Sequence, residues 1–130
     1  MEPDSKLGGG LFALRLIDGK VVWTAPPPVC DERPRCSPAQ SAPLTGMPGV
    51  IFSGALDGHL RAYSTSTGKI LWDFDTVRDF VTLDGSRARG GSIDVAGPVV
   101  VGGTLYVMSG YSQFGAIPGN VLLAFTVDGK

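Results

Sequence analysis

The residues best suited to chemistry form one polar stretch in the second half of the chain, Arg87-Ala88-Arg89-Gly90-Gly91-Ser92-Ile93-Asp94. Paired glycines let backbone N–H groups approach a ligand closely, while arginine and aspartate side chains can hold anionic groups or a metal ion. The alternative is that Gly90-Gly91 bends the chain inward and that the charged side chains are solvated. The sequence leaves both interpretations open.

The remaining reactive side chains indicate structural roles or stay ambiguous. His59 is the single histidine, binds no metal alone and has no nucleophile nearby, so we expect it to be structural. Asp73 and Asp75 alternate along an expected strand and should face solvent. Cys30 and Cys36 lie in a proline-rich loop, where a disulfide and a reduced pair are both possible, and two thiols alone make a poor zinc site. A disulfide would indicate an oxidising compartment.

Composition places the chain among β-rich globular proteins. Of its 130 residues 43% are hydrophobic and 18% charged, which permits a core. The 19 glycines and 10 prolines separate short apolar runs, a pattern typical of short strands joined by turns. No long window shows an apolar period of about 3.6 residues, so we expect little or no helix.

Charge and hydropathy exclude two classes of partner. The net charge is −1 and no dense row of cations is present, which argues against nucleic acid. No apolar run approaches the roughly 20 residues of a membrane span. The first residues lack the apolar core of a signal peptide, and we expect residues 1–8 to form a disordered tail.

An internal repeat organises the rest of the chain. Ala13-Leu14-Arg15-Leu16-Ile17-Asp18-Gly19-Lys20-Val21-Val22-Trp23 aligns without gaps with Ala62-Tyr63-Ser64-Thr65-Ser66-Thr67-Gly68-Lys69-Ile70-Leu71-Trp72. A third copy, one residue tighter, starts at Ala124. Glycine makes the turn of each copy, and a small alanine leaves room for the ring of a tryptophan that lies flat on the neighbouring unit. The repeat residues are Ala13, Gly19, Trp23, Ala62, Gly68, Trp72, Ala124 and Gly129.

Each repeat predicts a strand, a tight turn and a return strand. Further turns are expected at Pro48-Gly49, Asp57-Gly58 and Gly102-Gly103. The predicted strands are Leu11–Ile17, Val21–Thr24, Ser41–Thr45, Val50–Leu56, His59–Ser64, Ile70–Phe74, Val99–Val101, Thr104–Ser109 and Val121–Val127.

Four strands in a unit of roughly 50 residues, with one tryptophan after the last turn, are typical of a β-propeller blade. We label the strands of a blade A to D from the channel outward. The fold class is therefore all-β, a partial propeller of about two and a half antiparallel blades within residues 9–130. Strands C–D of one blade end at residue 25, a full blade covers about 41–75, and strands A–C of a third cover about 96–130. The alternative is a sandwich with a chance repeat.

The three long connections should project from one face of such a propeller. Ala25–Gln40 and Asp75–Gly97 are D–A connections and Gly110–Asn120 is a B–C connection, whereas every predicted A–B or C–D turn is tight. Long ordered loops on a rigid scaffold are where binding residues concentrate. Tyr111-Ser112-Gln113-Phe114-Gly115 offers aromatic and amide groups there, although such residues more often pack a loop.

The repeat resembles that of the pyrroloquinoline-quinone (PQQ) dehydrogenases, and longer stretches are similar to the C-terminal part of polyvinyl-alcohol dehydrogenases. The resemblance covers nearly the whole chain after Gly8. The stretches that carry it include Cys36-Ser37-Pro38-Ala39-Gln40-Ser41-Ala42, Phe52-Ser53-Gly54-Ala55-Leu56-Asp57-Gly58-His59, Gly90-Gly91-Ser92-Ile93-Asp94 and Gly119-Asn120-Val121-Leu122-Leu123-Ala124-Phe125.

This resemblance implies an eight-bladed periplasmic or secreted propeller that oxidises alcohols with PQQ and a calcium ion and passes electrons to cytochrome c. An aspartate acts as general base in such enzymes, and Asp94 is the best-positioned candidate here. The candidates for cofactor binding are Arg87, Gly90, Gly91 and Ser92.

About two and a half blades cannot close a ring, which typically needs four to eight. The partners are therefore the remaining blades of a longer protein or further copies of the chain, and we expect a truncated reading frame rather than self-assembly. The fragment alone should be inactive. Alternatives are a non-catalytic propeller that acts as a protein-binding scaffold and a repeat fragment without independent function.

Overall fold

The computed structural model describes residues 9–112 and 115–128, and these residues form β-strands and no helix. The expected tail 1–8, Gly129 and two residues of the 111–115 stretch lie outside this described part. None of the described residues forms a helix that could cross a membrane. The strands are β1 (Leu11–Leu14), β2 (Val21–Ala25), β3 (Thr45–Met47), β4 (Val50–Gly54), β5 (His59–Ser64), β6 (Ile70–Asp75), β7 (Asp79–Val81), β8 (Arg87–Arg89), β9 (Val99–Val101), β10 (Thr104–Ser109) and β11 (Val121–Phe125).

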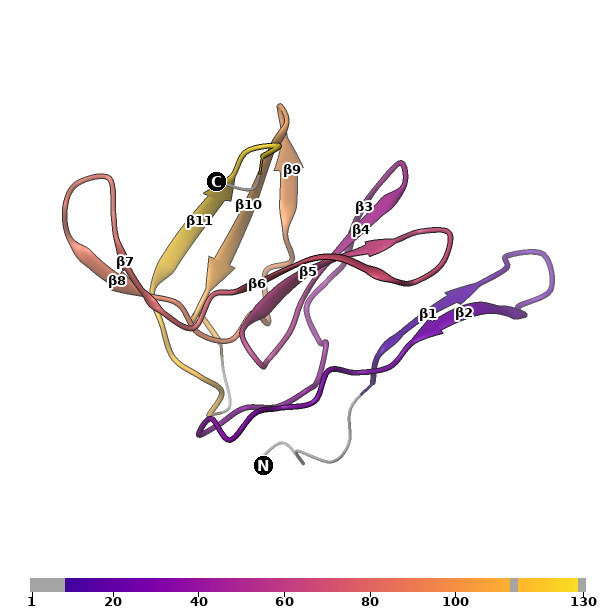
Figure 1. Ribbon diagram of the computed structural model, residues 1–130, viewed down its shortest axis with the longest axis horizontal. Helices are drawn as coiled ribbons and strands as arrows, with labels where there is room; N and C mark the ends of the chain where they lie inside the picture. Colours follow the sequence, from indigo (N-terminus) through magenta and orange to yellow (C-terminus); the bar gives the residue numbers. More distant parts are fainter. Residues whose placement is uncertain (1–8, 113–114, 129–130) are drawn as a thin grey trace.

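The strands pair only with their neighbours along the chain, in antiparallel sheets. The central sheet has the order β3-β4-β5-β6, and it is flanked by the β1-β2 hairpin and by the sheet β9-β10-β11. Figure 1 shows the β1-β2, β3-β4, β5-β6 and β9-β10 turns on the upper and right sides, and the β4-β5 turn and the connection between β2 and β3 on the lower side. The small hairpin β7-β8 extends separately from the connection that follows β6.

The sequence prediction is confirmed for most strands and wrong at two places. The strand expected at Ser41–Thr45 is absent, and the first strand of the central sheet is β3 instead. Pro43 has no N–H to donate to a sheet, and Ala42 is buried in the core of the protein. The long connection Asp75–Gly97 was expected to be loop throughout, but it contains the β7-β8 hairpin.

The turns within the repeat follow one pattern. In the β5-β6 turn the N–H of Gly68 donates to the carbonyl of Ser64, and in the β1-β2 turn Gly19 donates to Arg15 in the same way. Both glycines have positive φ, 71° and 67°, which explains why glycine stands at this position.

The repeat tryptophans pack between sheets. The indole of Trp23 lies against the α-carbon of Gly68, and its Nε1–H donates to the carbonyl of Thr65 at 2.8 Å. The alanine of the repeat is placed differently from the expectation, because Ala13 pairs with Trp23 across the same hairpin and Gly68 is the residue under the ring. Beside Trp23, the small residue that makes room on the neighbouring unit is therefore Gly68.

Two apolar clusters hold the three sheets together. The larger one joins the central sheet to β9-β10-β11 and is built around Leu60, Ile93 and Val107. Within it Phe125 packs edge-on against the rings of Trp72 and Phe74. The smaller cluster joins the β1-β2 hairpin to Tyr63 of the central sheet through Leu11, Trp23 and Ala25.

Candidate functional site on the loop face

Backbone hydrogen bonds connect the three long connections to one another and to the β4-β5 turn. Leu56 N–H donates to the carbonyl of Ala39, and Ile93 N–H donates to that of Ala55. Ser92 N–H donates to the carbonyl of Ile117. The segments that the sequence assigned to one face therefore do lie together, and they form a continuous backbone layer at the ends of the sheets, which we call the loop face.

Gly90 and Gly91 are glycines because other backbone segments pass against them. A Cβ on Gly90 would lie 1.8 Å from the carbonyl oxygen of Thr76, and one on Gly91 would lie 2.3 Å from that of Ile117. Both residues are buried. The glycine pair thus lets two other backbone segments pack closely against it, and it does not line an open, solvent-filled space.

A buried cluster of hydroxyl groups, those of Thr76, Ser109 and Ser92, stabilises this contact. Thr76 Oγ1 donates a hydrogen bond to the carbonyl of Gly58 at 2.6 Å and lies 2.7 Å from Ser109 Oγ. Ser109 Oγ accepts from Gly91 N–H at 2.8 Å. Ser92 Oγ donates to the carbonyl of Leu56 at 2.6 Å. Sequence reasoning missed Thr76 and Ser109, which are single hydroxyl residues at strand ends and carry no local signal.

The charged residues of the predicted site lie at the edge of this layer. Asp94 is half-buried and accepts a hydrogen bond from Ser41 Oγ at 2.6 Å. Arg87 is exposed at the start of β8. Arg89 forms an exposed ion pair with Asp79 at 2.8 Å. Asp94 and Arg87 are thus the two candidates whose charged groups remain partly accessible.

The described residues do not by themselves fit PQQ with calcium. The N–H groups of Gly90, Gly91 and Ser92 already donate to Arg78, Ser109 and Ile117 within the protein. Within residues 9–112 and 115–128, no three histidine, cysteine, aspartate or glutamate side chains converge as a metal site would require. A PQQ site of the expected kind needs groups beyond those described.

A second polar cluster occupies the central sheet. Arg61 forms a buried, two-point ion pair with Asp57, with 2.7 Å between Nη2 and Oδ2. Asp73 accepts from Arg61 Nε at 3.1 Å and shares a 2.6 Å hydrogen bond with His59 Nδ1. Burial alone would lower the pKa of Arg61, but the hydrogen bonds and charge of Asp57 outweigh burial and raise it. His59, Arg61 and Asp73 therefore form a structural network. The expectation that Asp73 faces solvent without a partner was wrong, because it accepts hydrogen bonds from both other side chains.

An ion pair joins the loop between Cys30 and Cys36 to the central sheet. Cys30 and Cys36 form a disulfide, and between them Arg33 donates two hydrogen bonds to the carboxylate of Asp75, at 2.9 and 2.7 Å. Burial alone would raise the pKa of Asp75, but hydrogen bonds from Arg33 and from Val77 N–H outweigh burial and lower it. The ion pair holds the connection 26–44 against the end of β6.

This ion pair predicts a pH-dependent contribution to stability. Because the pKa of Asp75 is lowered in the folded state, its contribution is full above the ordinary aspartate pKa, near 4, and disappears as pH falls through the folded value. Arg33→Met should lower the free energy of unfolding by about 1 kcal/mol at pH 7 and by much less at pH 2. Urea unfolding at both pH values measures this.

The matched control is Arg35→Met, in the same loop but exposed. It should change the unfolding midpoint little at either pH. Equal losses for the two variants at pH 7, or a loss for Arg33→Met that persists at pH 2, would show that Asp75 does not depend on Arg33.

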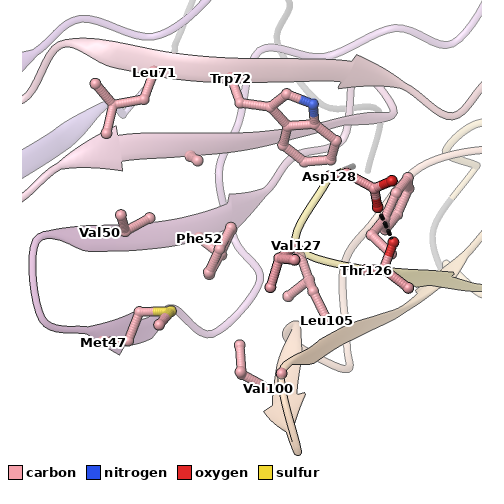
Figure 2. A pocket seen from close by; sticks show the side chains of 13 residues that line it. Met47, Val50, Phe52, Leu71, Trp72, Val100, Leu105, Thr126, Val127 and Asp128 are labelled. Atoms are coloured by element: carbon pink, nitrogen blue, oxygen red, sulfur yellow. Dashed lines mark hydrogen bonds between the residues drawn. The ribbon is translucent and has the colours of Figure 1, made fainter. Parts of the chain in front are cut away.

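An apolar cavity of about 470 Å³ lies between the central sheet and β9-β10-β11, lined among others by Phe52, Trp72, Leu105 and Val127. Figure 2 shows these side chains around it, with Asp128 hydrogen-bonded to Thr126 at its edge. It contains none of the predicted catalytic or cofactor-binding residues. The cavity is thus part of the packing between sheets, and the candidate chemistry lies elsewhere, on the loop face.

The sequence of this chain is similar to those of several alcohol dehydrogenases. Two polyvinyl-alcohol dehydrogenases, from Pseudomonas sp. and Sphingopyxis sp., are 47% and 44% identical over 93% of this chain. A quinohemoprotein alcohol dehydrogenase of Comamonas testosteroni is 30% identical over 98% of this chain. The chain spans about a fifth of the length of these relatives, 21%, 21% and 17% respectively. No family model matches the chain.

The fold comparison confirms the propeller. The crystal structure of BamB from Moraxella catarrhalis matches with a TM-score of 0.61 at 23% identity and covers 92% of this chain and 32% of that protein. At this identity the match concerns the fold alone. The predicted fold class, a partial all-β propeller of antiparallel blades, is therefore confirmed.

Proposed function

Because this chain is homologous to polyvinyl-alcohol and quinoprotein alcohol dehydrogenases, we propose that it forms part of the propeller of a PQQ-dependent enzyme that oxidises alcohol groups. In this role the chain supplies about two and a half consecutive blades and their loop face, while the rest of the cofactor site comes from other blades. The proposal extends to electron transfer to cytochrome c and to a periplasmic or secreted location. The Cys30–Cys36 disulfide supports an oxidising compartment.

The observation that carries the proposal is the interlocked loop face. The segment 90–94 is one of the stretches that resemble the family, and its backbone is hydrogen-bonded both to the β4-β5 turn and to the connection 110–120. Rigid supporting backbone is what a catalytic site needs, because small displacements of reacting groups cost much of the rate.

We assign different roles to the residues of this segment. Gly90, Gly91 and Ser92 act indirectly, by fixing the loop layer. The half-buried carboxylate of Asp94 is the candidate base for the alcohol proton, and its bond from Ser41 Oγ orients it. Arg87, exposed at the edge, is the candidate contact for an anionic group of the cofactor. PQQ, when bound, supplies the electron acceptor, and calcium would polarise it.

A chimera tests this function. The matching segment of the Pseudomonas polyvinyl-alcohol dehydrogenase is replaced by this chain, and polyvinyl-alcohol-dependent reduction of an electron-accepting dye is measured with PQQ and Ca²⁺ present. We expect turnover by the chimera. Asp94→Asn in the chimera should lower kcat by about 100-fold or more, as loss of a general base does.

Asp79→Asn is the matched control, since Asp79 is an exposed carboxylate on the neighbouring β7. It should leave turnover unchanged. Equal turnover by the Asp94 and Asp79 variants would remove Asp94 from the reaction. A folded chimera without turnover would contradict the proposed function itself.

A further inference from the structure

The hydroxyl group that orients the candidate base Asp94 belongs to Ser41, and both chain neighbours of Ser41 are fixed in the protein. Ser41 itself is exposed, and its Oγ–H donates to Asp94 Oδ1 at 2.6 Å. Ala42, on one side, is buried in the larger apolar cluster. Gln40, on the other side, directs its amide into the protein, where Oε1 is buried. Since the backbone cannot turn at Ser41 without moving both neighbours, their positions decide where the hydroxyl group points.

The amide of Gln40 is held by two hydroxyl groups of the central sheet. Its Nε2–H groups donate to Ser53 Oγ in β4 and to the phenolic oxygen of Tyr63 in β5, both at 3.1 Å. Ser53 is 0% exposed and Tyr63 is 1% exposed, so water does not compete for these bonds. Oε1 has no hydrogen-bond partner among the described residues, so the two bonds of Nε2 alone fix the amide. Gln40 is therefore anchored on strands and not on another loop.

The segments that carry Ser41 and Asp94 also meet at one residue of the β4-β5 turn. Leu56 N–H donates to the carbonyl of Ala39 at 2.9 Å, and the carbonyl of Leu56 accepts from Ser92 Oγ at 2.6 Å. Leu56 thus sets the spacing of the two segments. It does not set the directions of Ser41 and Asp94, each of which lies two residues further along the chain. The direction of the hydroxyl group needs a further anchor.

We propose that Gln40 is a positioning residue for Asp94, because its anchored amide holds Ser41 in the direction from which the hydroxyl group donates to the carboxylate. The role toward Ser41 follows from the geometry, and its catalytic consequence rests on the proposed function of Asp94 as the base for the alcohol proton. A base that loses its orientation loses rate rather than substrate affinity, because small displacements of reacting groups are costly.

A double-mutant cycle in the full-length chain measures the contact between Ser41 and Asp94. Unfolding equilibrium constants are determined in urea for the unmodified chain, Ser41→Ala, Asp94→Ala and the double variant. We expect the effect of Ser41→Ala to be about fivefold larger with Asp94 present than with alanine in its place. In a Gln40→Met background the two effects should become independent, with a coupling below about twofold. Methionine has a similar length but cannot donate to Ser53 or Tyr63.

A second variant and a control separate positioning from stability. Ser53→Ala combined with Tyr63→Phe removes both acceptors and keeps Gln40, and it should abolish the coupling as Gln40→Met does. Arg33→Met weakens the same connection at its ion pair with Asp75 and should leave the coupling at about fivefold, since a general loss of stability acts equally on all members of the cycle. Full coupling in either anchor variant would overturn the proposal. So would a cycle without coupling in the unmodified chain, or loss of coupling in the Arg33 variant.

The chimera with the Pseudomonas enzyme tests the catalytic consequence. Gln40→Met in the chimera should lower kcat by about tenfold and leave KM within about twofold. An unchanged kcat in a chimera that turns over would contradict the positioning of the base by Gln40. A chimera without any turnover contradicts the proposed function instead, and the double-mutant cycle still decides whether Gln40 holds Ser41.

Discussion

Gly90→Ala should destabilise the protein by about 3 kcal/mol or more, measured as the free energy of unfolding in urea. The added methyl group would lie 1.8 Å from the carbonyl oxygen of Thr76 and 3.0 Å from Ser109 Oγ. The obstacle is backbone, and Thr76 cannot retreat without losing its hydrogen bonds to Gly58 and Ser109. The clash therefore disrupts the hydrogen bonds of the hydroxyl cluster that joins the connections of the loop face.

Gly46→Ala is the matched control. Gly46 lies in β3, has no positive φ, and an added Cβ there meets no atom within 4 Å. Alanine should leave stability unchanged or raise it by up to about 1 kcal/mol, because glycine in a strand loses more backbone entropy on folding. Similar losses at positions 90 and 46 would mean that the backbones do not meet at Gly90 as described.

Asp57→Ala should cost about 3–5 kcal/mol, because it leaves the guanidinium of Arg61 buried without its main counter-charge. Both side chains are 5% exposed, and the pair is joined by two hydrogen bonds. Asp57 also accepts a hydrogen bond from His59 N–H, which closes the β4-β5 turn. Chemical unfolding of the variant measures the loss.

Two comparisons isolate the buried charge. Asp79→Ala removes an exposed partner of Arg89 and should cost less than about 1 kcal/mol. Adding Arg61→Met to Asp57→Ala should recover part of the loss, because an apolar side chain of similar length needs no counter-charge. If the single Asp57 variant were no less stable than the Asp79 variant, or if the second change made it worse, burial of the charge would not be the cause.

Local signals in the sequence were sufficient for most of the fold. The strands His59–Ser64, Val99–Val101 and Thr104–Ser109 coincide with the structure, since each is a short run with apolar residues that directly precedes or follows a turn containing glycine. The β7-β8 hairpin was missed although Asp84-Gly85 is a turn signal of the same type. Its flanking strands have only three residues each, too few to show alternation.

The candidate site was predictable in position but not in detail. Turn lengths were enough to bring the long connections to one face, because strand order in a blade fixes where each connection emerges. From the sequence, the role of the glycine pair at 90–91 could be either contact with a ligand or close packing of backbone. The structure gives its N–H groups partners within the protein. Those partners, such as Ser109 and Ile117, are distant along the chain, and no local pattern connects them to Gly91 or Ser92.

The cofactor content of the purified chimera tests the central claim most directly. The chimera is reconstituted with PQQ and Ca²⁺, freed of excess cofactor, and its bound PQQ is determined by absorbance against protein concentration. If this chain is a working segment of a quinoprotein propeller, one PQQ should be retained per polypeptide, as in the parent enzyme treated in parallel. A chimera that folds as judged by circular dichroism but retains no PQQ would contradict the claim.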